Sequence, residues 1–236
     1  MRQVLNILDN PIWTALTTKQ KHFAEGDNLA RRYPVEVTAL AALENNSPAA
    51  FASLAEITNG DAAALFCYES ISIPAKWKII HTSNLVQMVC EAPKIARGEE
   101  TVIIDELTSA DSTEMVALTK LTNPGPFGKR THELGLYLGI HQNGRLAAMA
   151  GERQRLPGFT EVSAVCTHPD FQGRGFAAVL ISAIMAKILE RGETPMLHVR
   201  EDNAGAIRVY EKLGCRTRAV FPFYVLRYEA QAAKSK

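Results

Sequence analysis

The stretch that decides the fold is residues 167–177, which read THPDFQGRGFA. An alternating run typical of a strand precedes it, over residues 159–167, and an apolar run typical of a helix follows at once. Gly173 and Gly175 allow a tight turn between the two elements. The first amides of a helix have no acceptor inside it, and the helix dipole adds positive charge there. The segment therefore predicts a site for a phosphate or diphosphate.

Other readings of this turn compete with the phosphate site. A single G-x-G is explained equally by a plain strand-to-helix connection that needs glycine for its φ angles. A dinucleotide fingerprint is disfavoured, because the turn comes late in the domain. A P-loop is excluded, because Lys-Ser or Lys-Thr does not follow the second glycine. The choice between a phosphate site and a plain turn therefore depends on the residues around the turn.

The elements on either side predict an α/β domain with a mixed sheet. Upstream, Asn143-Gly144 favours a two-residue hairpin turn between strands at 134–141 and 146–150. Downstream, a long helix ends near Gly192, a common helix-ending residue. A strand at 196–200, a helix at 203–213 and a last strand at 221–228 complete this half.

The first part of the chain predicts a smaller α+β region. Helices are expected after Pro11 and Ser47, and strands at 64–68 and 77–80. A polar stretch near 91–100 favours a boundary, which gives residues 1–97 as a region of uncertain role and 98–236 as the main domain. A short strand is expected at 102–104.

Composition excludes several classes of protein. The net charge of +1 gives no basic excess for nucleic acid, and no apolar run reaches the length needed to span a membrane. The first ten residues lack the apolar core of a signal peptide. The four cysteines show no metal-ligand spacing, so we expect reduced thiols, no metal and a cytoplasmic location.

Three motifs in order resemble the GNAT superfamily of acetyltransferases. Residues 172–177, QGRGFA, fit Q/R-x-x-G-x-G/A, the motif that holds the acyl-CoA diphosphate in that family. Residues 165–169 are similar to the strand end and turn before it, and residues 203–214 to the helix after it. The resemblance covers roughly residues 101–228. It implies a GNAT-like mixed sheet with splayed central strands, flanked by helices, and acetyl-CoA as cosubstrate.

The resemblance also implies which residues bind the cosubstrate. The pantetheine arm is expected between the strand that ends at Thr167 and the strand at 196–200. The backbone of the glycine turn would hold the diphosphate, and the Asn203 side chain would lie near the pantetheine or the phosphates. The implied set is Val165, Thr167, Gln172, Gly173, Arg174, Gly175, Phe176, Ala177 and Asn203.

Acetyl transfer requires a base for the ammonium, an oxyanion donor and an acid for the leaving thiolate. By resemblance Tyr210 is the candidate acid; the alternative is an aromatic packed in its helix. Glu161 is the candidate base, with a pKa raised by partial burial; the alternative is a charge facing solvent. Strand alternation places Glu161, Ser163 and Val165 on one face, with Cys166 on the other. A backbone amide near Val165 is the expected oxyanion donor, and transfer is expected to be direct.

The function expected from these features is an N-acetyltransferase acting on a small-molecule or peptide amine. The alternative is a non-catalytic acyl-CoA sensor; a module for ATP or NAD is a third reading. The loop residues Phe127, Lys129, Arg130 and Glu133 line the acceptor pocket or stand in solvent. The sequence leaves open whether the amino-terminal region is a degenerate copy or a lid, and whether the protein is a homodimer.

Overall fold

The structure is a computed structural model that describes residues 6–94, 96 and 102–229. The chain divides into two compact units, and neither is one continuous segment. The first holds residues 6–35, 39–85 and 221–229, and the second holds residues 36–38, the described part of 86–102 and 103–220. Each unit is therefore built from separate segments of the chain. The division of the chain at residue 97 stays a prediction.

Unit 1 carries strands in the order β1-β2-β3-β4-β11-β5. β3 and β4 are parallel, with Leu40 opposite Ala64, and α2 connects them. Ser47 caps α2 by accepting a hydrogen bond from the Ala50 amide, as the Ser-Pro pair predicts. The elements are α1 (Pro11–Thr17), β1 (Glu25–Gly26), β2 (Ala30–Arg32), β3 (Leu40–Leu43), α2 (Pro48–Thr58), β4 (Ala62–Phe66), β5 (Trp77–Val89) and β11 (Arg216–Tyr228), with a 3₁₀ turn at Lys21–Phe23.

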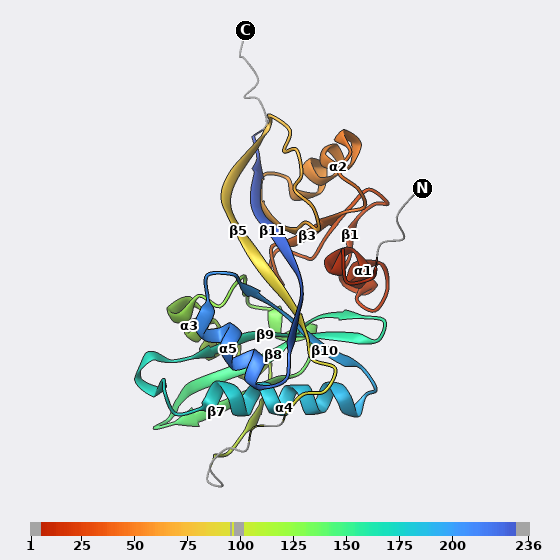
Figure 1. The fold of residues 1–236 in the computed structure, drawn as a ribbon. Helices are drawn as coiled ribbons and strands as arrows, with labels where there is room; N and C mark the ends of the chain where they lie inside the picture. Colours follow the sequence, from red (N-terminus) through yellow and green to blue (C-terminus); the bar gives the residue numbers. More distant parts are fainter. Residues whose placement is uncertain (1–5, 95, 97–101, 230–236) are drawn as a thin grey trace. The chain divides into compact units, whose positions relative to one another are not determined.

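Unit 2 carries the predicted mixed sheet, in the order β6-β7-β8-β9-β10-β5-β11. The strands β5 and β11 are each divided between the two units. Residues 86–89 of β5 and 216–220 of β11 belong to unit 2, and the rest of each strand belongs to unit 1. Figure 1 traces both as long strands. The other elements are β6 (Asp105–Leu107), α3 (Ser112–Thr122), β7 (Tyr137–Gln142), β8 (Arg145–Leu156), β9 (Phe159–Thr167), α4 (Phe176–Glu190), β10 (Thr194–Arg200) and α5 (Ala204–Lys212), with 3₁₀ turns at Ser109–Asp111, Thr131–Leu134 and Pro169–Phe171.

Helices cover both faces of the sheet in unit 2. On one face, α4 packs against β7 to β10 around the buried Leu180, Ile184 and Leu197, and α5 joins the same cluster through Tyr210. On the other face, α3 packs through Met115 and Leu118 against β8 and β9. The predicted α/β fold class and the Asn143-Gly144 hairpin turn, with φ of 53° and 72°, are confirmed.

Two expectations about local structure are wrong. Residues 102–104 are not a strand; β6 begins three residues later, at Asp105. Cys90 and Cys215 form a disulfide across 125 residues, where the absence of a paired spacing had led us to expect thiols. The two are brought together by β5 and by the end of α5, a long-range contact that spacing does not reveal. Cys67 and Cys166 are free thiols.

Among the described residues, no helix is long and apolar enough to cross a membrane. In the same part of the chain, no group of three or more His, Cys, Asp or Glu side chains is arranged to hold a metal ion.

Candidate active site

The central strands of unit 2 separate as the resemblance implies. β9 and β10 are parallel and pair at three positions, from Phe159–Thr194 to Glu161–Met196. Beyond Glu161, the register partners of β9 lie on β8, with Ser163 opposite Gly151 and Thr167 opposite Ala148. The two parallel strands therefore diverge toward their carboxyl ends, and this leaves main-chain groups of β9 for another partner.

A β-bulge lies at the point of divergence. Ala164 has φ of 51°, a left-handed conformation that a non-glycine residue rarely adopts. Between the pairs Ser163–Gly151 and Cys166–Met149, β9 has two residues where β8 has one. The extra residue reverses the alternation, so that Val165 packs with Val162 on the α4 side. The expectation that Val165 shares a face with Glu161 and Ser163 is therefore wrong.

The glycine turn leaves the start of α4 open. Gly173 and Gly175 both have φ of 77°, and a Cβ built at either would meet no atom within 4 Å. Gly175 is the N-cap of α4 and offers no side chain to its first amides. His168 has a local structural role, since its Nδ1 accepts a hydrogen bond from the Asp170 amide. Uncapped amides next to open space are the features that a diphosphate requires.

Two arginines stand over the same aromatic ring beside this turn. The Arg174 guanidinium lies 5.2 Å from the centre of the Phe171 ring, and that of Arg145 lies 5.4 Å from it. Arg145 also pairs with Asp170 at 3.2 Å. Gln172 is exposed, whereas Phe176 is buried under the turn. The sequence motif includes Arg174, but it could not reveal Arg145, which comes from the start of β8.

Tyr210 lies on α5, with 8% of its surface exposed. Burial raises the pKa of its hydroxyl to about 12, and the nearby Glu161 carboxylate adds to the rise. The hydroxyl therefore keeps its proton at neutral pH and is able to donate it. Asn203 begins the same helix, and its Oδ1 accepts a hydrogen bond from the Ala206 amide at 3.1 Å.

Glu161 is fully buried and held by two partners. Its oxygens lie 2.8 Å from Arg153 Nε and 2.6 Å from Arg153 Nη2, and His198 Nδ1 lies 2.8 Å from Oε1. Burial by itself would raise the pKa of this carboxyl, but the Arg153 charge and these hydrogen bonds lower it to about 2. The expectation of a raised pKa is wrong, because the sequence does not show that Arg153 faces Glu161.

These residues belong to a row of polar side chains across five neighbouring strands. Arg218 Nη1 donates to Gln87 Oε1 at 2.7 Å, so the Gln87 amide nitrogen faces His198 Nε2 at 3.0 Å and donates to it. His198 Nε2 is therefore the acceptor, and the Nδ1 proton of His198 points to Glu161. The row joins β11, β5, β10, β9 and β8.

A small pocket, which we call the loop pocket, lies beside this row. The loop after α3 and the strands β7 to β9 form its walls. Of the four loop residues that the sequence had placed at the acceptor pocket or in solvent, Phe127 lines this pocket and Lys129, Arg130 and Glu133 do not. Arg130 makes two 2.8 Å hydrogen bonds to the exposed Glu133. The lining residues are Pro124, Gly125, Pro126, Phe127, Thr131, Tyr137, Arg153, Ser163 and Ala164.

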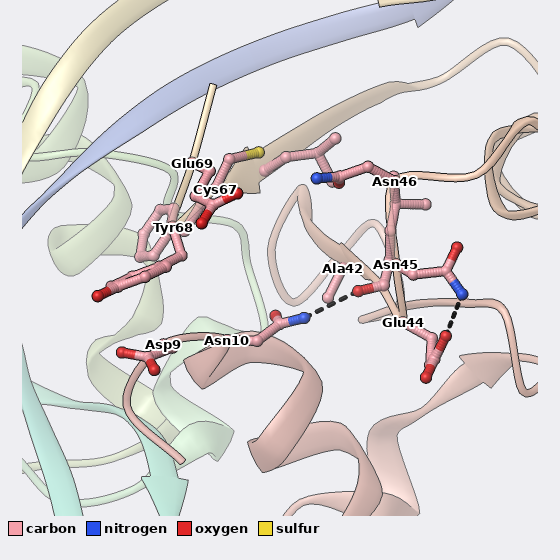
Figure 2. Close-up of a pocket in the computed structure, with 12 residues that line it drawn as sticks. Asp9, Asn10, Ala42, Glu44, Asn45, Asn46, Cys67, Tyr68 and Glu69 are labelled. Atoms are coloured by element: carbon pink, nitrogen blue, oxygen red, sulfur yellow. Dashed lines mark hydrogen bonds between the residues drawn. The ribbon is translucent and has the colours of Figure 1, made fainter. Parts of the chain in front are cut away.

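Unit 1 has a pocket of its own, at the carboxyl ends of the parallel strands β3 and β4 (Figure 2). The side chains of Asp9, Glu44 and Glu69 line it, and Asn10 donates a hydrogen bond to the Leu43 carbonyl there. None of its lining residues in the described chain is lysine or arginine. This acidic pocket would repel a diphosphate, so unit 2 is the better place for one.

The thiol of Cys166, which lies near the site, is not activated as a nucleophile. Cys166 packs with the α3 side of the sheet, away from Val165, as predicted. Burial raises its pKa to about 12. A thiol that stays protonated is a poor nucleophile, and this agrees with direct transfer.

Comparison with known proteins points the same way. The model of the FR47-like protein family matches residues 137–222. A crystal structure of a protein assigned to the GNAT family of acetyltransferases, from Novosphingobium aromaticivorans, is similar to this chain, with 36% identity and a TM-score of 0.87. The alignment covers 96% of this chain and all of that one.

Two further proteins extend the likeness. A GCN5-related N-acetyltransferase from Kribbella flavida shares 16% identity and a TM-score of 0.65 over 93% of this chain and 96% of that one, which shows a similar fold. A protein named acetyltransferase from Yersinia enterocolitica is 53% identical over 53 residues, which is 22% of this chain. The match spans 37% of the length of that relative.

Proposed function

Because this chain belongs to the GNAT family of acetyltransferases, we propose that it transfers an acetyl group from acetyl-CoA to the nitrogen of an amine. The observation that carries the proposal is the divergence of β9 from β10 next to an uncapped helix with a glycine turn. The divergence offers main-chain groups to a pantetheine arm, and the turn offers amides to a diphosphate. Arg145 and Arg174 add positive charge for the phosphates.

The residues of unit 2 then have distinct roles. The backbone from Gly173 to Ala177 holds the diphosphate, while Val165 and Thr167 hold the pantetheine. The amide near Val165 donates to the oxygen of the thioester, where negative charge grows during attack. The Oδ1 atom of Asn203 caps α5. The amide nitrogen of the same side chain donates to the cosubstrate in this proposal. Gln172 and Phe176 complete the turn.

Transfer is direct in this proposal. The neutral amine attacks the thioester carbon, a C–N bond forms, and the C–S bond breaks. The electrons of that bond leave on sulfur, and the Tyr210 hydroxyl supplies a proton to the thiolate. The attacking nitrogen loses one proton to solvent water, and solvent returns one to the Tyr210 phenolate, so the phenol is restored. Tyr210 is suited to this role because its raised pKa keeps it protonated.

Glu161 is a weaker candidate for the base than the sequence indicated. A carboxylate with a pKa near 2 takes a proton poorly from an ammonium, whose pKa is about 10.4. Both of its oxygens are also engaged by Arg153. We assign Glu161 to holding Arg153 and His198 in place, and its role as base stays a prediction.

The experiment that tests the function is release of free CoA thiol from acetyl-CoA with a panel of amines. Release that depends on an amine, together with a matching acetylated product, supports the proposal. Tight CoA binding without release for any amine would favour the sensor instead, and no binding of CoA would overturn both.

A further inference from the structure

The hydroxyl of Tyr137 is buried without a hydrogen-bond partner among the described residues. Tyr137 begins β7 and is 1% exposed. Its ring lies across Gly151, where an added Cβ would fall 2.3 Å from it, and the Phe127 ring meets it edge-on at 5.8 Å. Burial raises the pKa of this phenol, so it keeps its proton. A buried donor with nothing to bond lowers stability, so an acceptor atom from a bound molecule would stabilise it.

The loop pocket gives this donor a setting. Tyr137, Arg153 and Ser163, whose side chains carry donor groups, line it from the strands, and none of its lining residues in the described chain is acidic. The positive charge of Arg153 is already balanced by Glu161, which binds it through two hydrogen bonds. A negative group placed here would therefore be buried without a compensating charge. An uncharged oxygen needs no such charge.

The loop pocket is also next to the reacting atoms of the proposed function. Ala164, the bulge residue, lines it, and the following residue is Val165, where the thioester oxygen is to be held. The opposite wall is apolar, because Pro124, Pro126 and Phe127 form it. Because the pocket is small, it would hold a single oxygen atom carried next to the carbon that bears the amine.

We propose that the loop pocket binds the uncharged carbonyl oxygen of an amino-acid amide or of the first residue of a peptide, through a hydrogen bond from Tyr137. The acceptor is then an amine with a neighbouring carbonyl, in preference to a free amino acid with its carboxylate or to a plain alkylamine. This inference rests on the proposed function and names its acceptor class.

The test compares three acceptors that share one skeleton: alanine amide, alanine and isopropylamine. Thiol release is measured with the unsubstituted protein, with Tyr137→Phe and with Tyr228→Phe as the matched control, since Tyr228 packs on Trp77 in unit 1. For Tyr137→Phe we expect kcat/KM to fall about tenfold with alanine amide and to stay unchanged with isopropylamine. The melting temperature should stay equal or rise, because the unbonded hydroxyl is gone.

The outcomes separate the subsite from the function. If the unsubstituted protein is active but Tyr137→Phe slows all three acceptors equally or none, the subsite is wrong and the function stands. If there is no turnover, calorimetry with alanine amide decides: binding that Tyr137→Phe weakens supports the subsite. Binding that is absent, or equal in both proteins, overturns it.

Discussion

Glu161 and Arg153 face each other across neighbouring strands as a buried pair joined by two hydrogen bonds of 2.8 and 2.6 Å. Glu161 lies on β9 and Arg153 on β8, and His198 on β10 completes the contact at 2.8 Å. The pair lies just before the bulge at Ala164 that separates β9 from β10. It fixes the strand at the place where the proposed acetyl transfer occurs.

The first prediction concerns Glu161→Gln. Removing one charge leaves Arg153 buried without its counterion, and breaking a buried pair in this way costs about 3–5 kcal/mol. The glutamine keeps part of the hydrogen bonding, so we expect the lower end of that range. Chemical denaturation measures the loss. A change within about 0.5 kcal/mol would contradict the described pairing.

The same pair predicts how stability depends on pH. The folded pKa of Glu161 is lowered from 4.5 to about 2, so its contribution is present above pH 4.5 and is lost as pH falls toward 2. The shift in pKa corresponds to a contribution of about 3 kcal/mol to the free energy of unfolding. The gap in unfolding free energy between the unsubstituted protein and Glu161→Gln should therefore shrink over this window. A gap that does not change with pH would speak against an ionised Glu161.

Tyr210→Phe tests the proposed acid. Loss of a general acid lowers rates by about 10²–10⁴-fold, and kcat should fall within that range while the Kd for CoA stays within twofold. Because burial raises the pKa of Tyr210 to about 12, no loss of activity from its ionisation is expected near neutral pH. Steady-state kinetics across pH provide the check, with Tyr228→Phe as control. Full activity in the variant would remove Tyr210 from the mechanism.

Gly175→Ala separates backbone strain from cosubstrate binding. A left-handed alanine costs about 1–2 kcal/mol, and Gly158, with φ of 78° and open space around it, is a matched control. Both alanine variants should lose similar stability. Only Gly175→Ala should weaken acetyl-CoA binding, by about tenfold, because its Cβ would stand where the diphosphate approaches. Equal effects on binding in the two variants would argue against the site.

The Cys90–Cys215 disulfide holds the end of α5, since the Cys215 amide donates to the Tyr210 carbonyl at 3.0 Å. Cys90→Ser should lower the free energy of unfolding by about 2–5 kcal/mol relative to the oxidised protein. Reducing agent should then have little further effect on this variant. Cys67→Ser, at a free thiol in unit 1, is the control and should still respond to reduction.

Local patterns predicted much of unit 2, and long-range contacts explain what they missed. The glycine turn, the helix at Phe176 and the Asn143-Gly144 hairpin depend on neighbouring residues, so their sequences suffice. The bulge residue is an alanine, so no glycine in the sequence indicates a bulge at position 164. Regular strand alternation therefore placed Val165 on the wrong face. The partners of Glu161 and the orphan hydroxyl of Tyr137 depend on which strands are neighbours, and the sequence does not give that order.

In the proposed function, the amides at the start of α4 hold the diphosphate of acetyl-CoA. The most direct measurement is amide NMR of ¹⁵N-labelled protein during titration with CoA. We expect large shifts for the amides of residues 173–177, with smaller ones near Val165 and Thr167. Shifts confined to the pocket of unit 1, or no shifts at saturating CoA, would contradict it.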